Sequence, residues 1–424
     1  MIFKEHKVTV QQVAGLIPQD LLSTLAINTK VDYCAKVLQA ERLFYLLMYA
    51  IIRTDRISQR YLEDVFRSTH FKFLFNYCVD MKVSHSSISE KLSKINLDFF
   101  KQAYQQIYDR YNQLYSSKEQ EQHCLIRVDS SMVAEAGTRL QKGMEVGDKK
   151  KEPSANNRKQ VKYTMAYDGQ AVCLAKVHTE PAFLSEDIAM PSVLFDLIKA
   201  DKTHRNIYTF DRGLSSLANF NELNQAESCF VGRIKTNRKI EIVSKLTNEC
   251  EDLDLGSLEL ISDDIVHLYD SGKKAFDTTQ YRLIKAKRKV LLDTTPRKSK
   301  GKTKKVENDI YFITNNFAMS AKEIADIYKK RWDIEVFFRF IKQELSFKHF
   351  LSVNENGLQV MLYMTLITAM LLMVYKKLND IGFVTAKRRL SIELEDIILK
   401  MAITICGGDV NKLKFGEYRN IVPG

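Results

Sequence analysis

Apolar residues recur at the spacing of α-helices through the first part of the chain. The clearest case is 38–53, whose sequence LQAERLFYLLMYAIIR places apolar side chains along one helical face. Ser58 and Ser84 each precede a further periodic stretch and are typical N-cap residues. We therefore predict an all-helical region over 1–115.

The lysines of this helical region leave two interpretations open. If Lys82, Lys91 and Lys94 are exposed on short helices, they suit a helix-turn-helix-like DNA-binding unit. An ordinary helical bundle with solvated lysines would give the same pattern, and the sequence does not separate the two.

Short β-rich runs alternate with helical stretches from residue 123 onward. Asp168 and Gly169 separate two of these runs and mark a hairpin. The predicted elements are strands at 123–129, 159–167 and 170–179, a helix at 185–200, a strand at 206–210, a helix at 214–226 and a strand at 229–234. This order indicates a mixed α/β sheet. Pro191 predicts a flaw in the first helix, or a break between two short helices.

A β-rich, turn-rich sequence interrupts this order over 236–309. A further strand is predicted at 309–314, and the chain is helical from Ser320 onward, with turns near its glycines, including Gly357. Within this part, 358–374 is almost wholly apolar and approaches the roughly 20 residues that span a bilayer. Because polar residues interrupt it, we interpret it as a helix buried in a large domain; a single membrane anchor is the alternative.

The composition is that of a globular protein with a positive balance. The 424 residues include 64 Lys and Arg against 52 Asp and Glu, a net charge of +12. This charge favours nucleic acid as a partner, with an anionic membrane surface second. Seven scattered cysteines without a Cys-x-x-Cys pair indicate reduced thiols in a cytosolic protein and argue against structural zinc. The N-terminal residues contain no uninterrupted apolar stretch, so no signal peptide is predicted.

Much of the positive charge gathers in one segment, 281–305, which has 11 Lys and Arg and one acid, a net charge of 11 − 1 = +10. Its centre cannot pack against a core, so we expect a loop there. In this loop Lys298, Lys300 and Lys302 are predicted to contact DNA.

Two carboxylates stand at the ends of predicted strands. Asp129 follows the run LIRV, and Asp211 follows the run IYTF. A strand end can hold a carboxylate rigidly at an open surface, although either residue alone could be an ordinary turn residue. The eight histidines are scattered, and no GxxxxGK[ST] motif is present, so neither a zinc hydrolase nor a nucleotide-driven motor is indicated.

A third carboxylate, Glu335, lies in a predicted helix beside an apolar stripe. Tyr328, Arg331, Glu335 and Lys342 fall within about 60° of arc on that helix. A solvated Arg–Glu pair four residues apart would look the same. Together with the two aspartates, however, Glu335 suggests a site for two Mg²⁺ ions, with Mn²⁺ as a substitute, that performs phosphoryl transfer.

These motifs resemble bacterial insertion-sequence transposases of the DDE type, whose catalytic core is ribonuclease-H-like. The Tyr-Arg-Glu-Lys (YREK) signature of that group is matched at Tyr328, Arg331, Glu335 and Lys342. The segments 128–130 and 210–213 are similar to the first and second aspartate motifs. The β-rich stretch between Asp211 and Glu335 resembles the insertion domain of the group.

The resemblance implies an α/β fold, with a ribonuclease-H-like mixed sheet, flanking helices, an N-terminal helical domain and a β-rich insertion before the last catalytic helix. The expected divisions are a helical DNA-binding domain at 1–115, the catalytic core at 120–235 and 310–380, the insertion domain at 236–309 and a C-terminal helical region at 381–424.

The resemblance also implies an activity and its residues. The three acids Asp129, Asp211 and Glu335 would bind two Mg²⁺ ions, and the remaining signature residues would contact double-stranded DNA at the transposon end. Water would cut one strand at the inverted repeat, the freed 3′-OH would close a hairpin, and after hairpin opening it would attack target DNA. The protein would act as a homodimer in the synaptic complex, without a membrane or nucleotide cofactor, in the bacterial cytoplasm in association with the nucleoid.

The aromatic residues depart from the group, whose members can stack an insertion-domain tryptophan on a flipped base. Trp332, the single tryptophan of this chain, lies in the predicted signature helix instead. Tyr269, Phe276 or Tyr281 could supply the aromatic face, and the sequence does not choose among them.

Two other functions share these features. An inactivated relative could be a sequence-specific DNA-binding repressor with structural carboxylates, and a metal-dependent nuclease could cut without joining. All three acids stand in their motifs, which favours a transposase over the repressor, and the four-position signature favours it over the nuclease.

Overall fold

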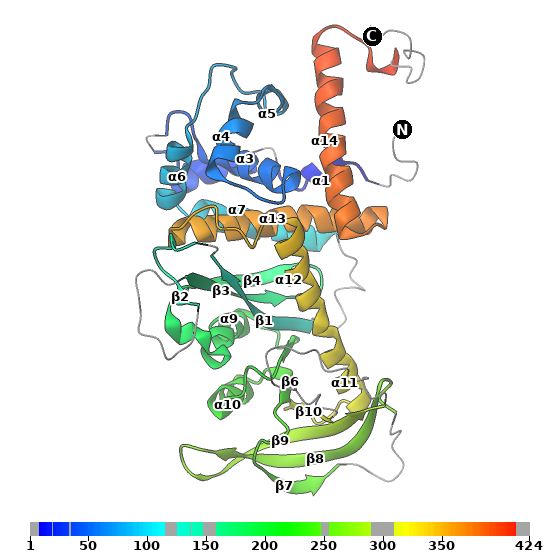
Figure 1. The fold of residues 1–424 in the computed structure, drawn as a ribbon. Coiled ribbons are helices and arrows are strands. Elements are labelled where there is room, and N and C mark those ends of the chain that lie inside the picture. Colours follow the sequence, from blue (N-terminus) through cyan, green and yellow to red (C-terminus); the bar gives the residue numbers. More distant parts are fainter. Residues whose placement is uncertain are drawn as a thin grey trace, which may run out of the picture. The chain divides into compact units, whose positions relative to one another are not determined.

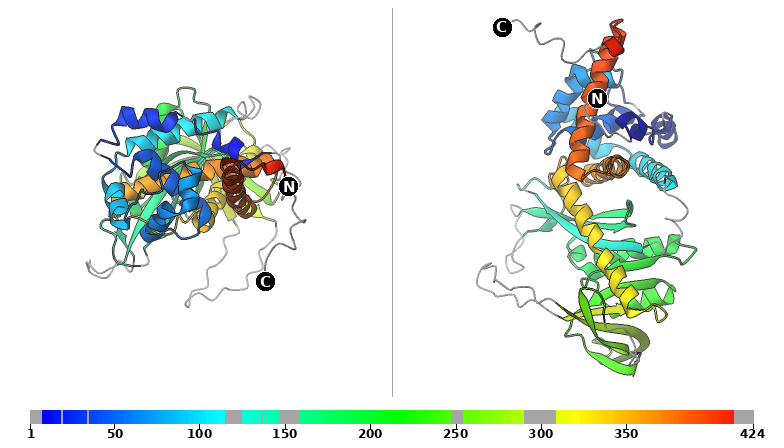
Figure 2. Two further views of the ribbon diagram at one scale, coloured as in Figure 1. Left: turned by 90° about the horizontal axis from the view of Figure 1, so that it is seen from above. Right: turned by 90° about the vertical axis from the view of Figure 1, so that its right-hand side faces the viewer.

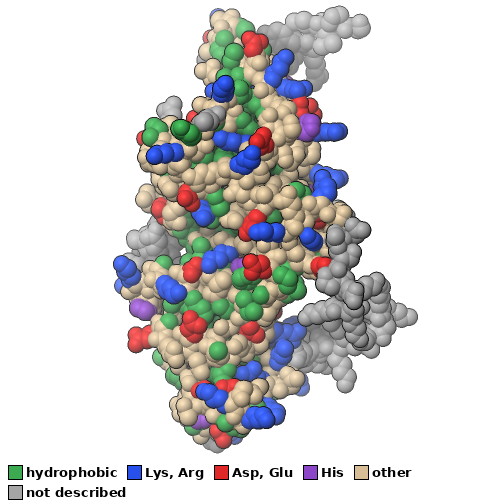
Figure 3. Space-filling model, turned by 90° about the vertical axis from the view of Figure 1, so that its left-hand side faces the viewer, with side chains coloured by type: hydrophobic (Ala, Val, Ile, Leu, Met, Phe, Trp, Pro, Cys, Tyr) green, Lys and Arg blue, Asp and Glu red, His purple; other side chains and the backbone are tan. Residues whose placement is uncertain are grey.

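The computed structural model describes residues 8–18, 20–33, 35–114, 125–135, 137–146, 158–246, 254–289 and 309–412. The chain forms two compact units, whose elements are drawn in Figure 1 and Figure 2. One unit is Tyr115–Arg339, and the other joins Met1–Leu114 to Phe340–Gly424. On the face drawn in Figure 3, charged side chains of both signs are interspersed rather than gathered by sign.

A ten-stranded mixed sheet forms the centre of the unit 115–339. Its strands are β1 Leu125–Ala134, β2 Met144–Glu145, β3 Lys159–Tyr167, β4 Val172–His178, β5 Ile207–Phe210, β6 Cys229–Ile234, β7 Ile240–Lys245, β8 Leu258–Asp270, β9 Ala275–Arg288 and β10 Asp309–Thr314. They lie in the order β2-β3-β1-β5-β6-β10-β9-β8-β7, and β4 pairs with β3.

The first strands of the sheet combine antiparallel and parallel pairing. β1, β3 and β4 form an antiparallel meander, and β5 and β6 add to β1 as parallel strands. In the parallel register Val128 lies opposite Phe210. The parallel pairing of β1 with β5 ends at this pair, so the next residues, Asp129 and Asp211, lie at neighbouring positions. β1 itself continues to Ala134, so Asp129 lies within its strand and not at the strand end that the sequence predicted, whereas Asp211 does follow the end of β5. The mixed α/β sheet predicted from the sequence is therefore confirmed.

The β-rich stretch after residue 236 continues this sheet. Within the described residues it forms β7, β8 and β9, and β10 joins β9 to β6 through antiparallel pairing on both sides. The strand predicted at 309–314 is β10.

Helices cover both faces of the sheet in the unit 115–339. The short 3₁₀ helix η1 Pro181–Leu184 precedes them, and the helices are α9 Glu186–Ala200, α10 Leu217–Gln225, α11 Ala321–Lys330 and α12 Trp332–Glu344, which continues past the unit boundary. α9 and α10 pack on one face around Val128 and Phe210, and α11 packs on the opposite face around Val231 and Phe312. Figure 1 shows α9 and α10 beside the sheet and α11 at its other side.

α9 runs as one helix through Pro191, so Pro191 is a flaw within a helix and the alternative, a break between two short helices, is wrong. A proline cannot donate to the carbonyl four residues earlier, which here belongs to Asp187. The side-chain amide of Asn219 donates to that carbonyl at 3.0 Å instead. The missing helical hydrogen bond is therefore replaced from the neighbouring helix α10.

The single helix predicted around the signature is divided in two at Arg331. Arg331 keeps right-handed helical angles (φ −56°, ψ −30°), but α11 ends before it and α12 begins after it. The side chain of Arg127 donates from Nε to the carbonyl oxygen of Lys330 at 2.8 Å. This bond occupies the carbonyl oxygen of Lys330, which in a continuous helix would accept a hydrogen bond from the backbone N–H four residues later.

The other unit is helical. Its elements are α1 Val10–Ala14, α2 Leu21–Thr29, α3 Ala40–Arg53, α4 Gln59–Arg67, α5 Thr69–Leu74, α6 His85–Lys94, α7 Asp98–Gln113, α13 Glu355–Asn379, α14 Phe383–Ile405 and the 3₁₀ helix η2 Val410–Lys412. α13 packs against α3, α6, α7 and α14. It is long and apolar enough to cross a membrane, but 78% of its apolar window is buried, as expected for a core helix. Gly357 lies in its first turn rather than in a predicted turn between helices, and a Cβ there would come 2.2 Å from Ser352 Oγ.

Hydrogen bonds confirm both predicted N-caps in this unit. Ser58 accepts from the backbone N–H of Tyr61, and Ser84 accepts from that of Ser87. Lys91, which was expected on an exposed face, is half-buried, and its Nζ lies 3.3 Å from the carbonyl oxygen of Val31. Its charge therefore has a partner inside the helical unit.

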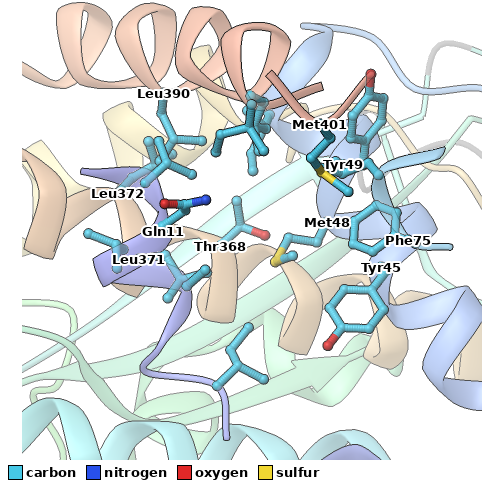
Figure 4. A pocket seen from close by; sticks show the side chains of 18 residues that line it. Gln11, Tyr45, Met48, Tyr49, Phe75, Thr368, Leu371, Leu372, Leu390 and Met401 are labelled. Atoms are coloured by element: carbon cyan, nitrogen blue, oxygen red, sulfur yellow. The ribbon is translucent and has the colours of Figure 1, made fainter. Parts of the chain in front are cut away.

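An apolar cavity of about 290 Å³ lies between α1, α3, α13 and α14 (Figure 4). Thr368 of α13 projects toward it, but its hydroxyl already donates to the carbonyl of Met364 at 2.8 Å. Methionines, Met48 and Met401, contribute flexible side chains to the lining. The helices of this unit are therefore less tightly packed where α14 meets the others.

Candidate active site

The structure brings five of the predicted site residues together in the unit 115–339. The guanidinium of Arg331 lies 2.6 Å from Glu335 Oε1 and 3.6 Å from Asp129 Oδ2. The phenol of Tyr328 donates a 3.0 Å hydrogen bond to Asp211 Oδ1. The three carboxylates of β1, of the turn after β5 and of α12 are therefore connected through two side chains at the α11–α12 junction.

Arg331 is the internal cation of this group. It is 7% exposed, its guanidinium lies 5.5 Å from the centre of the Tyr328 ring, and its buried Nε has no hydrogen-bond partner among the described residues. Burial alone would lower the pKa of Arg331, but Tyr328 and the carboxylates Glu335, Asp211 and Asp129 outweigh it and raise that pKa. Arg331 therefore remains charged and supplies the positive charge that the acids need.

The pKa of Asp129 is strongly raised by its surroundings. Burial raises the pKa of its carboxyl to about 6, although the backbone N–H of Ser130 and the charge of Arg331 act in the opposite direction. The charges of Glu186 and Glu335 raise this pKa further. Asp129 therefore changes charge close to neutral pH.

Tyr328 stays protonated and can act as a donor. Burial, with a further contribution from Asp211, raises the pKa of its phenol to about 12. The hydroxyl can then hold Asp211 in one orientation at neutral pH, because the bond needs the phenol hydrogen.

Arg127, which sequence reasoning missed, fixes the junction that carries Tyr328 and Arg331. Its side chain is buried in β1, donates from Nε to the carbonyl of Lys330 and forms a 2.9 Å ion pair with Asp333. The signal was present in the sequence, because a charge inside the apolar run LIRV must find a partner when it is buried. The partner itself lies about two hundred residues away.

Lys162 and Glu186 form a second charged pair that sequence reasoning missed. Lys162, in β3, is 2% exposed and donates to Glu186 Oε1 at 2.9 Å and to the carbonyl of Leu184 at 3.0 Å. Glu186 packs against the turn after Asp211, since a Cβ on Gly213 would lie 2.8 Å from Glu186 Cγ. A fourth carboxylate thus lies beside that turn.

The neighbouring Asp187 fixes the loop that follows Asp211. Its Oδ1 accepts from the backbone N–H of Ser215 at 2.6 Å and from that of Ser216 at 2.7 Å. Because Ser216 is the N-cap of α10, this carboxylate ties the N-terminal ends of α9 and α10 to one loop.

The donor chemistry of the three carboxylates fits a hard divalent cation, which prefers oxygen ligands. Asp129, Asp211 and Glu335 are gathered around one positive charge, so the site already concentrates negative potential. In the part of the chain that the structure describes, no group of three or more His, Cys, Asp or Glu side chains is close enough to share one ion. The three carboxylates thus fit metal ligands in chemistry and charge, but they are not close enough to share one ion, and Arg331 supplies the counter-charge to Asp129 and Glu335.

The remaining predicted residues are not part of this group. Lys342 is half-buried in the segment of α12 that belongs to the other unit. The loop residues Lys298, Lys300 and Lys302 lie outside the described residues.

The aromatic candidates for base stacking differ in exposure. Tyr281 is fully buried, and its hydroxyl bonds to Asn221, so it cannot present a face to DNA. Phe276 is 40% exposed and Tyr269 is half-buried, with their ring centres 5.3 Å apart. Trp332 is exposed at the start of α12.

Comparisons with known proteins agree with one another. A family model described as a transposase DDE domain matches residues 120–371, more than half of the chain. The chain is 29% identical to a putative transposase, y4zB, of Sinorhizobium fredii over 174 residues, which are 41% of this chain and 44% of that protein. It is 42% identical to a probable transposase for insertion sequence element IS5377 of Geobacillus stearothermophilus over 64 residues, 15% of this chain and 17% of that protein. These matches span less than half the length of the curated relatives.

A solved structure, the piggyBac transposase synaptic complex with hairpin DNA, is similar at a TM-score of 0.49 and 11% identity. That match covers 98% of this chain and 86% of the other.

Proposed function

The chain belongs to the family of transposase DDE domains, and we propose that it binds the inverted-repeat ends of its insertion sequence, cleaves them and joins the freed 3′-OH ends to target DNA. The observation that carries this proposal is the grouping of Asp129, Asp211 and Glu335 through Arg331 and Tyr328. A structural role for the acids would not require three of them, from separate elements, to surround one buried cation.

Asp129, Asp211 and Glu335 are the proposed ligands for two Mg²⁺ ions, or for Mn²⁺ in their place. Bound there, the ions would supply activation of the attacking oxygen and stabilisation of the leaving oxygen in an in-line displacement. The protein's own part is to hold the carboxylates in fixed orientations. Tyr328 does this for Asp211, and the Arg331 charge does it for the other two.

The signature residues other than Glu335 are the proposed DNA contacts. Arg331 can donate two parallel hydrogen bonds to a phosphate, which is a geometry that favours arginine. Tyr328 and Lys342 would add a hydroxyl and a second charge along the same DNA. The basic loop with Lys298, Lys300 and Lys302 would add charge that is independent of sequence.

The finer steps of the reaction extend the same proposal. Cleavage would pass through a hairpin on the transposon end: the freed 3′-OH would attack the phosphodiester of the opposite strand, forming a new bond between the two strands and releasing the flanking DNA with its own 3′-OH. A homodimer in the synaptic complex and a location in the bacterial cytoplasm, close to the nucleoid, complete it.

The test is cleavage of DNA that carries the sequences flanking the gene in its host. The purified protein with Mg²⁺ should cut at a terminal inverted repeat and release 3′-OH ends, and EDTA should stop cutting while end binding in a gel-shift assay remains. End binding without any cutting under Mg²⁺ or Mn²⁺ would favour the repressor instead, and cutting without joining to a target plasmid would favour a nuclease.

A further inference from the structure

A polar cleft of about 350 Å³ opens in the unit 115–339, apart from the carboxylates. Among the described residues that line it, three are cations, Lys235, Arg238 and Lys239, and none is an acid. The other lining residues include Tyr269 and Ser215. A concave surface that gathers positive charge and excludes carboxylates is suited to an anion.

The cleft forms where β6 ends and the chain turns into β7. Arg238 donates its backbone N–H to the carbonyl of Lys235 at 3.0 Å, which closes the turn. Tyr269, near the end of β8, donates its backbone N–H to the carbonyl of Lys239. The cations therefore stand on a turn that is bonded to a neighbouring strand, and not on a free loop.

Arg238 is oriented by two backbone carbonyls. Its Nη1 donates to the carbonyl of Ser215 at 3.2 Å, and its Nη2 lies 3.5 Å from the carbonyl of Tyr269. A guanidinium has five N–H donors in a rigid fork, so donors remain for a ligand. Lys239 Nζ lies 4.9 Å from the centre of the Tyr269 ring, which steadies the ammonium by a cation–π contact.

These three cations are not neutralised by acids of the described residues. Among the described residues, Lys235, Arg238 and Lys239 form no ion pair with a carboxylate, whereas Arg127 and Lys162 in the same unit each have one. Cations that are positioned but not neutralised leave a local charge of +3 that a ligand can balance.

The cleft is connected to the candidate active site through Ser215. Ser215 lies four residues after Asp211, and its backbone N–H is held by Asp187 while its carbonyl holds Arg238. One ordered loop therefore has a catalytic aspartate at its start and the cleft near its end.

We propose that this cleft binds a backbone phosphate of DNA. The bound phosphate would be a neighbour of the phosphate at which the strand is cut. The ligand class follows from the lining: a fixed guanidinium and two ammonium groups, with hydroxyls and no carboxylate, match a phosphodiester. This inference rests on the proposed function, because it places DNA across the loop that follows Asp211.

The experiment measures binding of a fluorescein-labelled 30-base-pair duplex by anisotropy between 50 and 300 mM KCl. Arg238→Gln and the more exposed Lys235→Gln should each weaken binding about three- to tenfold at 100 mM KCl and make the slope of log K against log salt shallower by about 1. A Lys199→Gln variant, at the exposed C-terminal end of α9, removes the same single charge elsewhere in the unit and should leave both quantities close to wild type. Thermal unfolding of each variant checks that the fold is retained. If Arg238→Gln unfolds, Lys235→Gln decides the question, because the Lys235 side chain has no partner to lose in the part of the chain that the structure describes.

The outcomes separate this inference from the proposed function. Wild-type slopes in the two cleft variants, with salt-dependent DNA binding intact, would overturn the cleft and leave the transposase proposal standing. Wild-type protein without salt-dependent DNA binding would overturn both. Stabilisation of the wild type by inorganic pyrophosphate alone, lost in the cleft variants while their DNA binding is unchanged, would mark a site for a free phosphate compound and overturn the DNA assignment.

Discussion

The phenol of Tyr328 donates a 3.0 Å hydrogen bond to the carboxylate of Asp211, which joins the signature helices to the strand-end aspartate directly. The ring of Tyr328 is packed against Phe312, 5.1 Å away between ring centres, so the hydroxyl is held at a fixed position. The geometry therefore assigns Tyr328 a positioning role toward Asp211, in addition to any contact with DNA.

Tyr328→Phe keeps the ring and removes only this bond. It should slow end cleavage at saturating DNA about two- to tenfold, since one hydrogen bond contributes about 0.5–1.5 kcal/mol. Single-turnover cleavage measures the rate, and a gel-shift titration measures DNA affinity, which should change little. Tyr33→Phe, on an exposed side chain, is the control. A loss of affinity without a loss of rate would mean that the hydroxyl serves DNA and not Asp211.

The three carboxylates should be individually indispensable for cleavage. Asp129→Asn, Asp211→Asn and Glu335→Gln preserve shape and remove a charge, and each should reduce cleavage by about 10³-fold or more. Glu344→Gln changes a carboxylate of the same helix α12 that does not join this group and should retain activity. Gel-shift assays should show end binding in all four variants. Cleavage near the wild-type rate in any of the first three would remove that residue from the proposed metal site.

The sequence was informative where the structure depends on local pattern. The positions of Asp129 and Asp211 could be predicted because each follows a short apolar run, and such runs form adjacent parallel strands in this unit. The same holds for the β4 hairpin partner and for the caps at Ser58 and Ser84.

Sequence reasoning failed where a partner is distant along the chain. Arg127 binds the junction about two hundred residues later, and this contact divides the helix that periodicity alone predicts as continuous. Lys162 could be recognised as an unusual charge in an apolar strand, but nothing in the sequence pairs it with Glu186. At Pro191 the sequence left a break between two short helices open, because the bond from Asn219 that replaces the missing donor could not be foreseen.

Asp129 should make the metal-free protein less stable as pH rises. Its carboxyl has a pKa of about 6 in the folded protein against about 4 in an unfolded chain, so the folded state binds the proton more tightly. Stability is therefore fully present below about pH 4 and is lost as pH rises through 6, by up to about 2–3 kcal/mol. Asp129→Asn, which cannot ionise, should be more stable than the wild type at pH 7.5 and lose this advantage at pH 4.5.

Urea unfolding in EDTA at the two pH values measures this difference. Asp326→Asn, an exposed carboxylate of α11, is the matched control and should show no such reversal. An Asp129→Asn variant that is less stable than the wild type at pH 7.5 would contradict a raised pKa for this carboxyl. In the wild type, Mn²⁺ affinity should rise with pH through about 6, because the proton must leave before the ion binds.

Arg127→Met should destabilise the unit 115–339. The substitution keeps an apolar stem but removes the donors to Lys330 and Leu125 and the ion pair with Asp333. Because the arginine is 5% exposed, we expect a loss of about 2–4 kcal/mol in the free energy of unfolding. Arg139→Met, which breaks the more exposed pair with Glu135, should cost about 1 kcal/mol or less. Equal effects of the two variants would show that the buried contacts of Arg127 do not determine stability.

Arg331 should compete with metal ions in the protein without DNA. Its guanidinium supplies the positive charge beside Asp129 and Glu335, which is the charge that bound ions would otherwise provide. Arg331→Gln should therefore bind Mn²⁺ about fivefold or more tightly in calorimetric titrations, since a unit charge at about 4 Å is worth about 1 kcal/mol even in water. Cleavage should nevertheless fall, because the same guanidinium is the proposed phosphate ligand. Arg339→Gln, an exposed position of α12, should leave Mn²⁺ affinity unchanged. Weaker Mn²⁺ binding by Arg331→Gln would reverse the interpretation: the guanidinium would then be what arranges the carboxylates as ligands, and not a competitor for their charge.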